Sequence, residues 1–152
     1  KNFNNREYFN HQGSHWAPHL IHRSFWKKIG GFSEEFNPGI GSDPDLNMKL
    51  WKSGVRIFKG LSKFRVYHFG SIVLRKKKNF MRNKGAQTFL LKWGITPIFF
   101  VKYYLNGGIF ENGVIKCKKF NEPLGEPKKN IFYFINLFLC KIKLTYLKIF
   151  RF

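Results

Sequence analysis

Asp43 and Asp45 are the only aspartates of the chain, and they lie two positions apart in the stretch GIGSDPDLNMKLWKSG. A carboxylate in such a place can accept a proton from a hydroxyl group, which is the chemistry of a general base. Gly39 and Gly41 come just before the pair, and they permit backbone shapes that bring a helix N-terminus close to a ligand. The alternative is that Asp43 only caps a helix, stabilised by the helix dipole and by free N–H groups.

Histidine is the second residue type here that could do chemistry. His68 lies near the carboxyl end of FRVYHF, which has the composition of a β-strand. Ligands gather at the carboxyl ends of strands in α/β sheets, whereas a lone histidine is more often a packed side chain. Four more histidines lie near the start of the chain: His11, His15, His19 and His22. Their spacing is near-helical, but Pro18 breaks a helix there and no cysteine or acidic residue accompanies them, so we do not expect zinc.

A wall of polar aromatic groups around a substrate fits these histidines better. Trp16 lies among them, and it could offer a flat apolar face to a sugar ring or equally well belong to the core. The basic run RKKKN follows the predicted strand of His68. Most such runs are solvated loops, but Arg75 and Lys76 are suited to pairing with phosphate oxygens.

Two helices are predicted around the paired aspartates. The segment RSFWKKIGGF predicts a short helix with Ser24 as N-cap and Gly30 just past its end. The next helix is predicted to begin with Asp43 as N-cap and Pro44 as its first helical residue, and to run to Gly54.

The rest of the chain predicts an α/β domain over residues 1–105. VRIFKG and FRVYHF read as two short strands, and two further helices are expected over 80–93 and from Thr96 through IFFVKYYL. The order of helix, strand, strand and helix is typical of an α/β arrangement. Residues 106–129 are rich in turn-forming residues and predict a linker.

Residues 130–152 predict a basic amphipathic helix. Lys141, Lys143, Lys148 and Arg151 lie among large apolar side chains. A membrane-spanning helix needs about 20 mostly uncharged residues, so we expect this helix to lie in a membrane interface with its basic side chains toward the headgroups. A core helix that docks on another part of the protein is the alternative.

Composition sets the wider limits. A chain of 152 residues with 43% hydrophobic residues is long and apolar enough to fold as one domain, which excludes wholesale disorder. The net charge of +20 suggests phosphate-rich partners, or merely the drift of an AT-rich coding sequence. Two cysteines are too few for a disulfide framework, which favours a reducing compartment. The chain begins at Lys1 rather than at methionine, and we interpret it as the later part of a longer protein.

These motifs, taken in order, resemble the acceptor half of family 2 glycosyltransferases. The matching stretch is HLIHRSFWKKIGGFSEEFNPGIGSDPDLNMKLWKSGVRIF followed by YHFGS, and it covers roughly residues 15–80. The family pattern has an Arg-x-x-Phe/Trp helix, Gly-Gly-Phe-Asp-Glu, Glu-Asp-x-Asp-Leu, a basic residue, a glycine and a later histidine. Ser33 and Ser42 stand here where the family has Asp and Glu.

The resemblance implies the C-terminal half of a GT-A, Rossmann-like domain with a mixed sheet, whose nucleotide-binding half lies outside this chain. The implied enzyme is an inverting, metal-dependent transferase that uses Mn or Mg and a nucleotide-sugar donor. It acts on a glycan or lipid-linked acceptor. Location in the cytoplasm, with peripheral contact to the inner face of a membrane, is expected, and binding of nucleic acid is not.

The resemblance also assigns roles to residues. Asp43 corresponds to the catalytic base and His68 to a metal ligand, and Arg75 to Lys78 are expected near the diphosphate. The expected substrate-binding residues are Ser42, Asp45, Trp16, His15, Lys49, Arg75 and Lys76. For Asp45 we expect an acceptor hydrogen bond or a structural role at the helix start. The rival hypothesis is a basic module without catalytic activity that binds nucleic acid or an anionic membrane.

Overall fold

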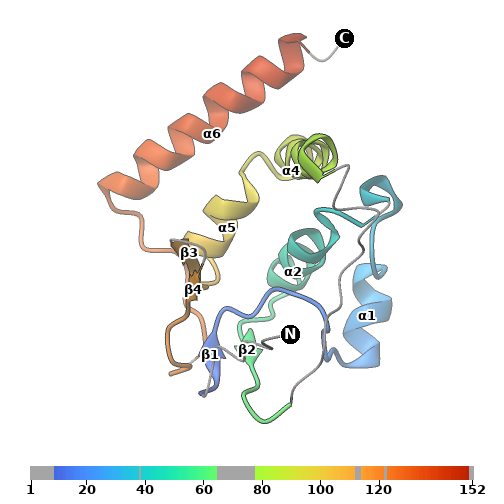
Figure 1. Cartoon of the computed structure of the whole chain (residues 1–152), viewed down its shortest axis with the longest axis vertical. Coiled ribbons are helices and arrows are strands. Elements are labelled where there is room, and N and C mark those ends of the chain that lie inside the picture. The colour runs from blue at the N-terminus through green and yellow to red at the C-terminus, as the bar shows by residue number, and fades with distance from the viewer. Residues whose placement is uncertain (1–8, 38, 65–77, 112–113, 122, 151–152) are drawn as a thin grey trace.

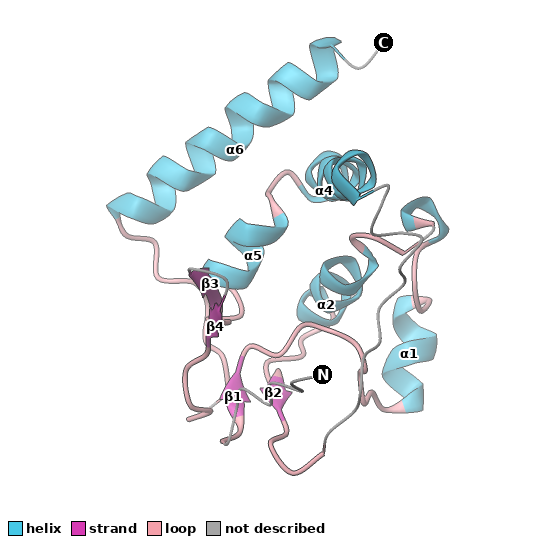
Figure 2. Cartoon of the chain, viewed as in Figure 1, coloured by secondary structure: helices cyan, strands magenta, loops and turns pink. Residues whose placement is uncertain are grey.

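A computed structural model describes residues 9–37, 39–64, 78–111, 114–121 and 123–150 of the chain. Over these residues the fold is mixed α/β, with helices predominant and only short strands (Figures 1 and 2). The elements in chain order are β1 (His11–Gln12), α1 (Arg23–Ile29), a 3-10 turn (Glu34–Phe36), α2 (Ser42–Lys52), β2 (Lys59–Gly60), α4 (Lys78–Trp93), α5 (Pro97–Tyr103), β3 (Ile109–Glu111), β4 (Val114–Lys116) and α6 (Ile131–Phe150). The general α/β class predicted from the sequence is therefore confirmed.

Two antiparallel strand pairs lie in the lower half of Figure 1. β1 pairs with β2 and β3 pairs with β4. Of the predicted strand VRIFKG only Lys59–Gly60 forms a ladder, and all of FRVYHF except Phe64 lies outside the described residues. Backbone hydrogen bonds from Gln12 N to Lys118 O and from Phe120 N to Asn10 O, at 2.8 and 2.7 Å, join the stretch after β4 to the start of the chain. The segment expected as a linker thus contains a hairpin and packs beside β1.

The helix α1 ends as predicted and begins two residues earlier than expected. Gly30 closes it with a φ of 71°, in the left-handed region where glycine costs little. The N-cap is His22 rather than Ser24, because the His22 Nδ1 atom accepts from the Ser24 backbone N–H at 3.3 Å and lies 2.7 Å from the Ser24 Oγ. The imidazole of His22 thus caps the helix in place of the Ser24 hydroxyl.

The start of α2 also differs from the prediction. Its N-cap is Gly41 with a φ of 93°, so Asp43 is the second helical residue and Pro44 the third. A glycine can adopt this φ where an aspartate is strained, which lets the helix begin earlier. Pro44 is tolerated because the N–H groups of the first turn have no partner within the helix. Asp43 remains in the positive field of the helix N-terminus.

The predicted helices after residue 78 are present. α4 contains the expected 80–93, and Thr96 caps α5 by accepting from the Phe99 backbone N–H at 3.1 Å. The core lies where α2, α4 and α5 meet, and Leu46, Phe89 and Phe100 are fully buried in it. α6 crosses α4 and α5 along one side of the molecule (Figure 1). The helix α2, which carries Asp43, packs on both α4 and α5.

Candidate functional site

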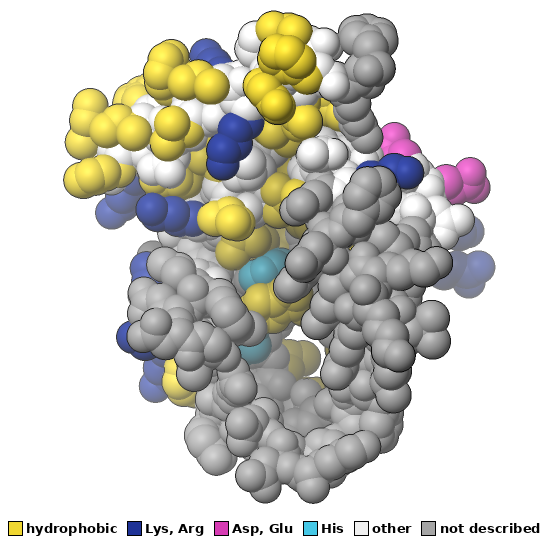
Figure 3. Space-filling model, turned by 45° about the horizontal axis from the view of Figure 1, so that its top comes forward, with side chains coloured by type: hydrophobic (Ala, Val, Ile, Leu, Met, Phe, Trp, Pro, Cys, Tyr) yellow, Lys and Arg dark blue, Asp and Glu magenta, His cyan; other side chains and the backbone are white. Residues whose placement is uncertain are grey.

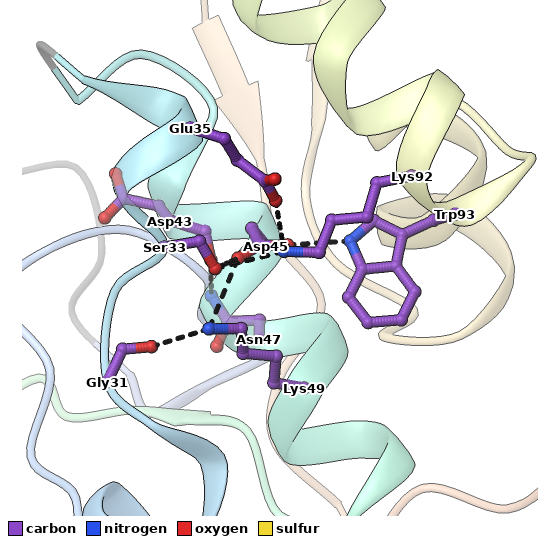
Figure 4. Close-up of polar contacts among 9 residues, drawn as sticks. All are labelled: Gly31, Ser33, Glu35, Asp43, Asp45, Asn47, Lys49, Lys92 and Trp93. Atoms are coloured by element: carbon purple, nitrogen blue, oxygen red, sulfur yellow. Dashed lines mark hydrogen bonds and ion pairs between the residues drawn. The ribbon is translucent and has the colours of Figure 1, made fainter.

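The two aspartates of the chain have opposite environments. Asp45 is fully buried, and its carboxylate accepts from the Ser33 Oγ and from the Trp93 Nε1, each at 2.7 Å (Figure 4). The Lys92 Nζ lies 2.9 Å from Asp45 Oδ1 and also pairs with Glu35. A buried charge needs such partners to offset its lost hydration. Of the two roles expected for Asp45, the structural one is therefore the role that its contacts support.

The Asp45 network joins three parts of the chain. Lys92 and Trp93 come from the end of α4, and Ser33 and Glu35 come from the segment between α1 and α2. Desolvation lowers the pKa of Lys92, but its hydrogen bonds to Glu35 and Asp45 outweigh this and raise the pKa above its ordinary value. The network consequently keeps a cation and an anion together at the junction of α2 and α4.

Lys49 supports the same junction from one helical turn further along. Its Nζ donates to the Gly31 carbonyl at 2.9 Å and lies 3.8 Å from Asp45 Oδ2. Ser42, predicted to contact substrate, donates its hydroxyl to the Gly39 carbonyl at 2.6 Å and shapes the turn before α2. Both side chains therefore bond to backbone carbonyls of the segment between α1 and α2.

Asp43 lies on the other side of the same helical turn. Figure 4 shows its side chain pointing away from the Asp45 carboxylate, and the residue is half-buried rather than sealed in. His19 is its electrostatic neighbour: burial lowers the pKa of His19, and the charge of Asp43 partly reverses that shift. A carboxylate and an imidazole thus share one environment at the N-terminus of α2.

Asn47 fixes this pair in place. It is buried, and its Nδ2 donates to the carbonyls of Asp43 at 2.7 Å and of His15 at 3.1 Å. The same Nδ2 lies 3.3 Å from the His19 Nε2. Sequence reasoning did not single out Asn47, although its spacing of four residues from Asp43 on one helix was a usable signal.

His15 and Trp16, predicted to contact substrate, lie on the segment that Asn47 holds. His15 is buried, with its Nδ1 2.8 Å from the Gly13 carbonyl, and desolvation lowers its pKa. Trp16 packs against it with ring centroids 4.0 Å apart and is 40% exposed. The exposed part of the Trp16 ring is therefore open to a ligand, whereas the buried His15 ring packs against it.

An open cleft of about 530 Å³ lies next to the Asp43 and His19 pair. His19 and Arg23 are its polar groups, and Trp26, Phe32 and Leu46 contribute apolar surface. The rings of Trp26 and Phe32 meet edge to face at 5.4 Å and remain partly exposed. Mostly apolar walls with a few polar groups are typical of small-molecule sites. Asp43 does not line this cleft itself, and its link to the cleft is its electrostatic effect on His19.

The remaining predicted site residues, His68, Arg75 and Lys76, lie outside the described residues. Within the described ranges no group of three or more His, Cys, Asp or Glu side chains could hold a metal ion. The residues present therefore do not form a site for the Mn or Mg implied by the resemblance, and the metal remains a prediction that depends on His68.

Comparison with known proteins adds no family assignment. The chain matches no family model, no curated protein and no solved structure.

Proposed function

We propose that this chain provides the acceptor-side part of an inverting, GT-A-type glycosyltransferase, in which Asp43 is the general base. The observation that carries this proposal is the difference between the two aspartates. Asp45 is sealed in a network of hydrogen bonds and ion pairs, whereas Asp43 is half-buried and acts electrostatically on His19, which lines the cleft. Two acidic residues with only structural roles would not need to differ in burial in this way.

The proposed step is the attack of an acceptor hydroxyl on the anomeric carbon of a nucleotide diphosphate sugar. The hydroxyl proton moves to a carboxylate oxygen of Asp43 while the new C–O bond forms, and the bond to the diphosphate breaks with its electron pair. General-base assistance typically contributes about 10²–10⁴-fold to such a rate. The N-terminus of α2 favours the ionised carboxylate, because the aligned peptide dipoles of the helix place partial positive charge at this end.

The neighbouring residues suit this role. Asn47 holds the backbone of Asp43 and the segment of His15 in one position, so the carboxylate has a defined place relative to the cleft. Trp26, Phe32 and Trp16 expose aromatic surface, against which the apolar face of a sugar can pack. The proposed acceptor is accordingly a glycan or a lipid-linked sugar that lies across this surface.

The test is the substitution Asp43→Asn in the full gene product that contains this chain. Activity is measured as release of nucleoside diphosphate from a panel of nucleotide diphosphate sugars and glycan acceptors. We expect the rate of transfer to fall by about 10²–10⁴-fold with unchanged binding of the nucleotide sugar. Glu34→Gln, at an exposed residue, is the matched control and should leave turnover intact.

Two outcomes would contradict the proposal. One is undiminished turnover in the Asp43→Asn enzyme, which would remove the base from Asp43. The other is the absence of any sugar transfer together with tight nucleic-acid binding that weakens steeply with salt, which is the behaviour of a basic binding module.

A further inference from the structure

The helix α6 has two chemically different long faces. Its inner face packs on α4 and α5, where Tyr133 and Cys140 are buried and Leu137 and Leu144 are partly buried. The Asn136 Nδ2 donates to the Tyr103 hydroxyl at 2.9 Å and so ties this face to α5. These contacts account for one side of the helix only.

The outer face of α6 is apolar and exposed. At 3.6 residues per turn, Ile135, Phe138, Ile142 and Ile149 lie opposite the buried Tyr133 and Cys140. Phe138 is 63% exposed and Ile142 is 50% exposed. Figure 3 shows hydrophobic side chains gathered in this part of the molecule, with Lys and Arg side chains beside them. An apolar surface that is this continuous marks an interaction site rather than chance exposure.

The lysines of α6 lie along the borders between these two faces. Lys143 lies on one border, and Lys141 and Lys148 lie on the other. All three are exposed, and the helix contains no acidic residue. Lys128 and Lys129 add two more exposed cations just before its first residue. A cation on each side of an apolar stripe matches the boundary between acyl chains and anionic headgroups.

A membrane surface accounts for this pattern better than a second copy of the chain. Two α6 helices packed through their outer faces would bring lysine borders together, and neither helix has an acidic residue to pair with them. Within the described residues there is no helix that is long and apolar enough to cross a bilayer. The lysine borders and the apolar outer face of α6 therefore suit a helix that lies along a membrane surface.

We propose that α6 docks this protein on anionic phospholipid membranes, with its outer face inserted at the level of the headgroups and upper acyl chains. Insertion of such helices is typically about 5–10 Å deep. The inner face stays on α4 and α5, so the helix binds lipid without leaving the domain. This inference is independent of the sugar-transfer proposal, because lipid binding requires neither Asp43 nor the cleft.

The experiment is co-sedimentation of the protein with vesicles of phosphatidylcholine alone and of phosphatidylcholine mixed with phosphatidylglycerol. We expect binding mainly to the mixed vesicles. The variant Lys141→Gln/Lys143→Gln/Lys148→Gln should lower that partitioning by about 100-fold, because each lysine near an anionic surface contributes about fivefold. The variant Phe138→Ser/Ile142→Ser should lower it by more than about tenfold.

A charge-matched control separates the docking helix from the overall positive charge. Lys27→Gln/Lys28→Gln/Lys52→Gln removes three exposed lysines from α1 and α2 instead, and it should change partitioning by no more than a few fold. All the substituted side chains are exposed, so the helix content of each variant should be unchanged, and circular dichroism checks this.

Three results would overturn the inference. They are failure of the wild-type protein to bind the mixed vesicles, an equal loss of binding in the control variant, and a wild-type dimer that Phe138→Ser/Ile142→Ser converts to a monomer in analytical ultracentrifugation. The last result would identify the outer face as a contact between two copies of the chain.

Discussion

Lys92 of α4 and Asp45 of α2 form an ion pair of 2.9 Å in which the carboxylate is completely shielded from water. The Arg56–Glu126 pair has the same separation, 2.9 Å, but its Glu126 side chain is 75% exposed. Distance alone would make the two pairs equivalent. Burial makes them different, because removing one partner of a buried pair leaves a polar group without hydration, whereas an exposed group returns to water.

Asp45→Asn should therefore destabilise the fold by about 2–4 kcal/mol, somewhat less than the roughly 3–5 kcal/mol of a fully buried pair, because Lys92 retains some contact with solvent. Glu126→Gln is the matched control and should cost less than about 1 kcal/mol. Urea denaturation followed by circular dichroism measures both free energies of unfolding. Equal losses in the two variants would contradict the structural role of Asp45.

Gly85 lets α4 approach the turn before α2. A Cβ at this position would collide with the Ile40 carbonyl, while Gly125 has no atom within 4 Å of its Cβ position. Gly85→Ala gains about 1 kcal/mol of helix propensity, but we expect overpacking of about 1–3 kcal/mol to outweigh this gain. Thermal unfolding should thus show a lower Tm for Gly85→Ala and no loss for Gly125→Ala. A stabilised Gly85→Ala protein would show that the approach is looser than described.

Local signals in the sequence were enough to predict most of the helices. The apolar spacing of α2, the Thr96-Pro97 start of α5 and the Gly30 end of α1 all depend on neighbouring residues, and each is present. The start of α2 was misplaced because Asp-Pro is a strong capping signal. The helix begins earlier because Gly41 adopts a positive φ and becomes the N-cap, and the amino-acid composition does not reveal this φ.

The candidate site was harder to predict, because its decisive contacts come from distant parts of the chain. Nothing near Asp45 in sequence indicates that Lys92 and Trp93 will enclose it, since both are more than forty positions away. The sequence motif therefore placed the two carboxylates on one helix, but only tertiary packing separates a shielded Asp45 from an accessible Asp43.

Stability should depend on pH through His15. Desolvation lowers the pKa of this buried ring below its ordinary 6.5, so the unfolded chain binds more protons than the folded one as the pH falls. The contribution of the neutral ring to stability is complete above about pH 6.5 and is lost as the pH drops from there toward the folded pKa. His15→Asn keeps a polar group near the Gly13 carbonyl and should flatten this part of the curve of unfolding free energy against pH. An unchanged slope would place the titrating group elsewhere.

His19 reports directly on the charge of Asp43. Burial lowers its pKa and the Asp43 carboxylate partly restores it, so Asp43→Asn should lower the pKa of His19 further. NMR titration of the His19 ring resonances measures this shift, and Glu34→Gln serves as the control because Glu34 is not among the groups that shift the pKa of His19. If the pKa of His19 is the same in Asp43→Asn and in the wild-type protein, the two side chains do not share one environment. The proposed base would then have lost its place beside the cleft, whatever the activity of the variant.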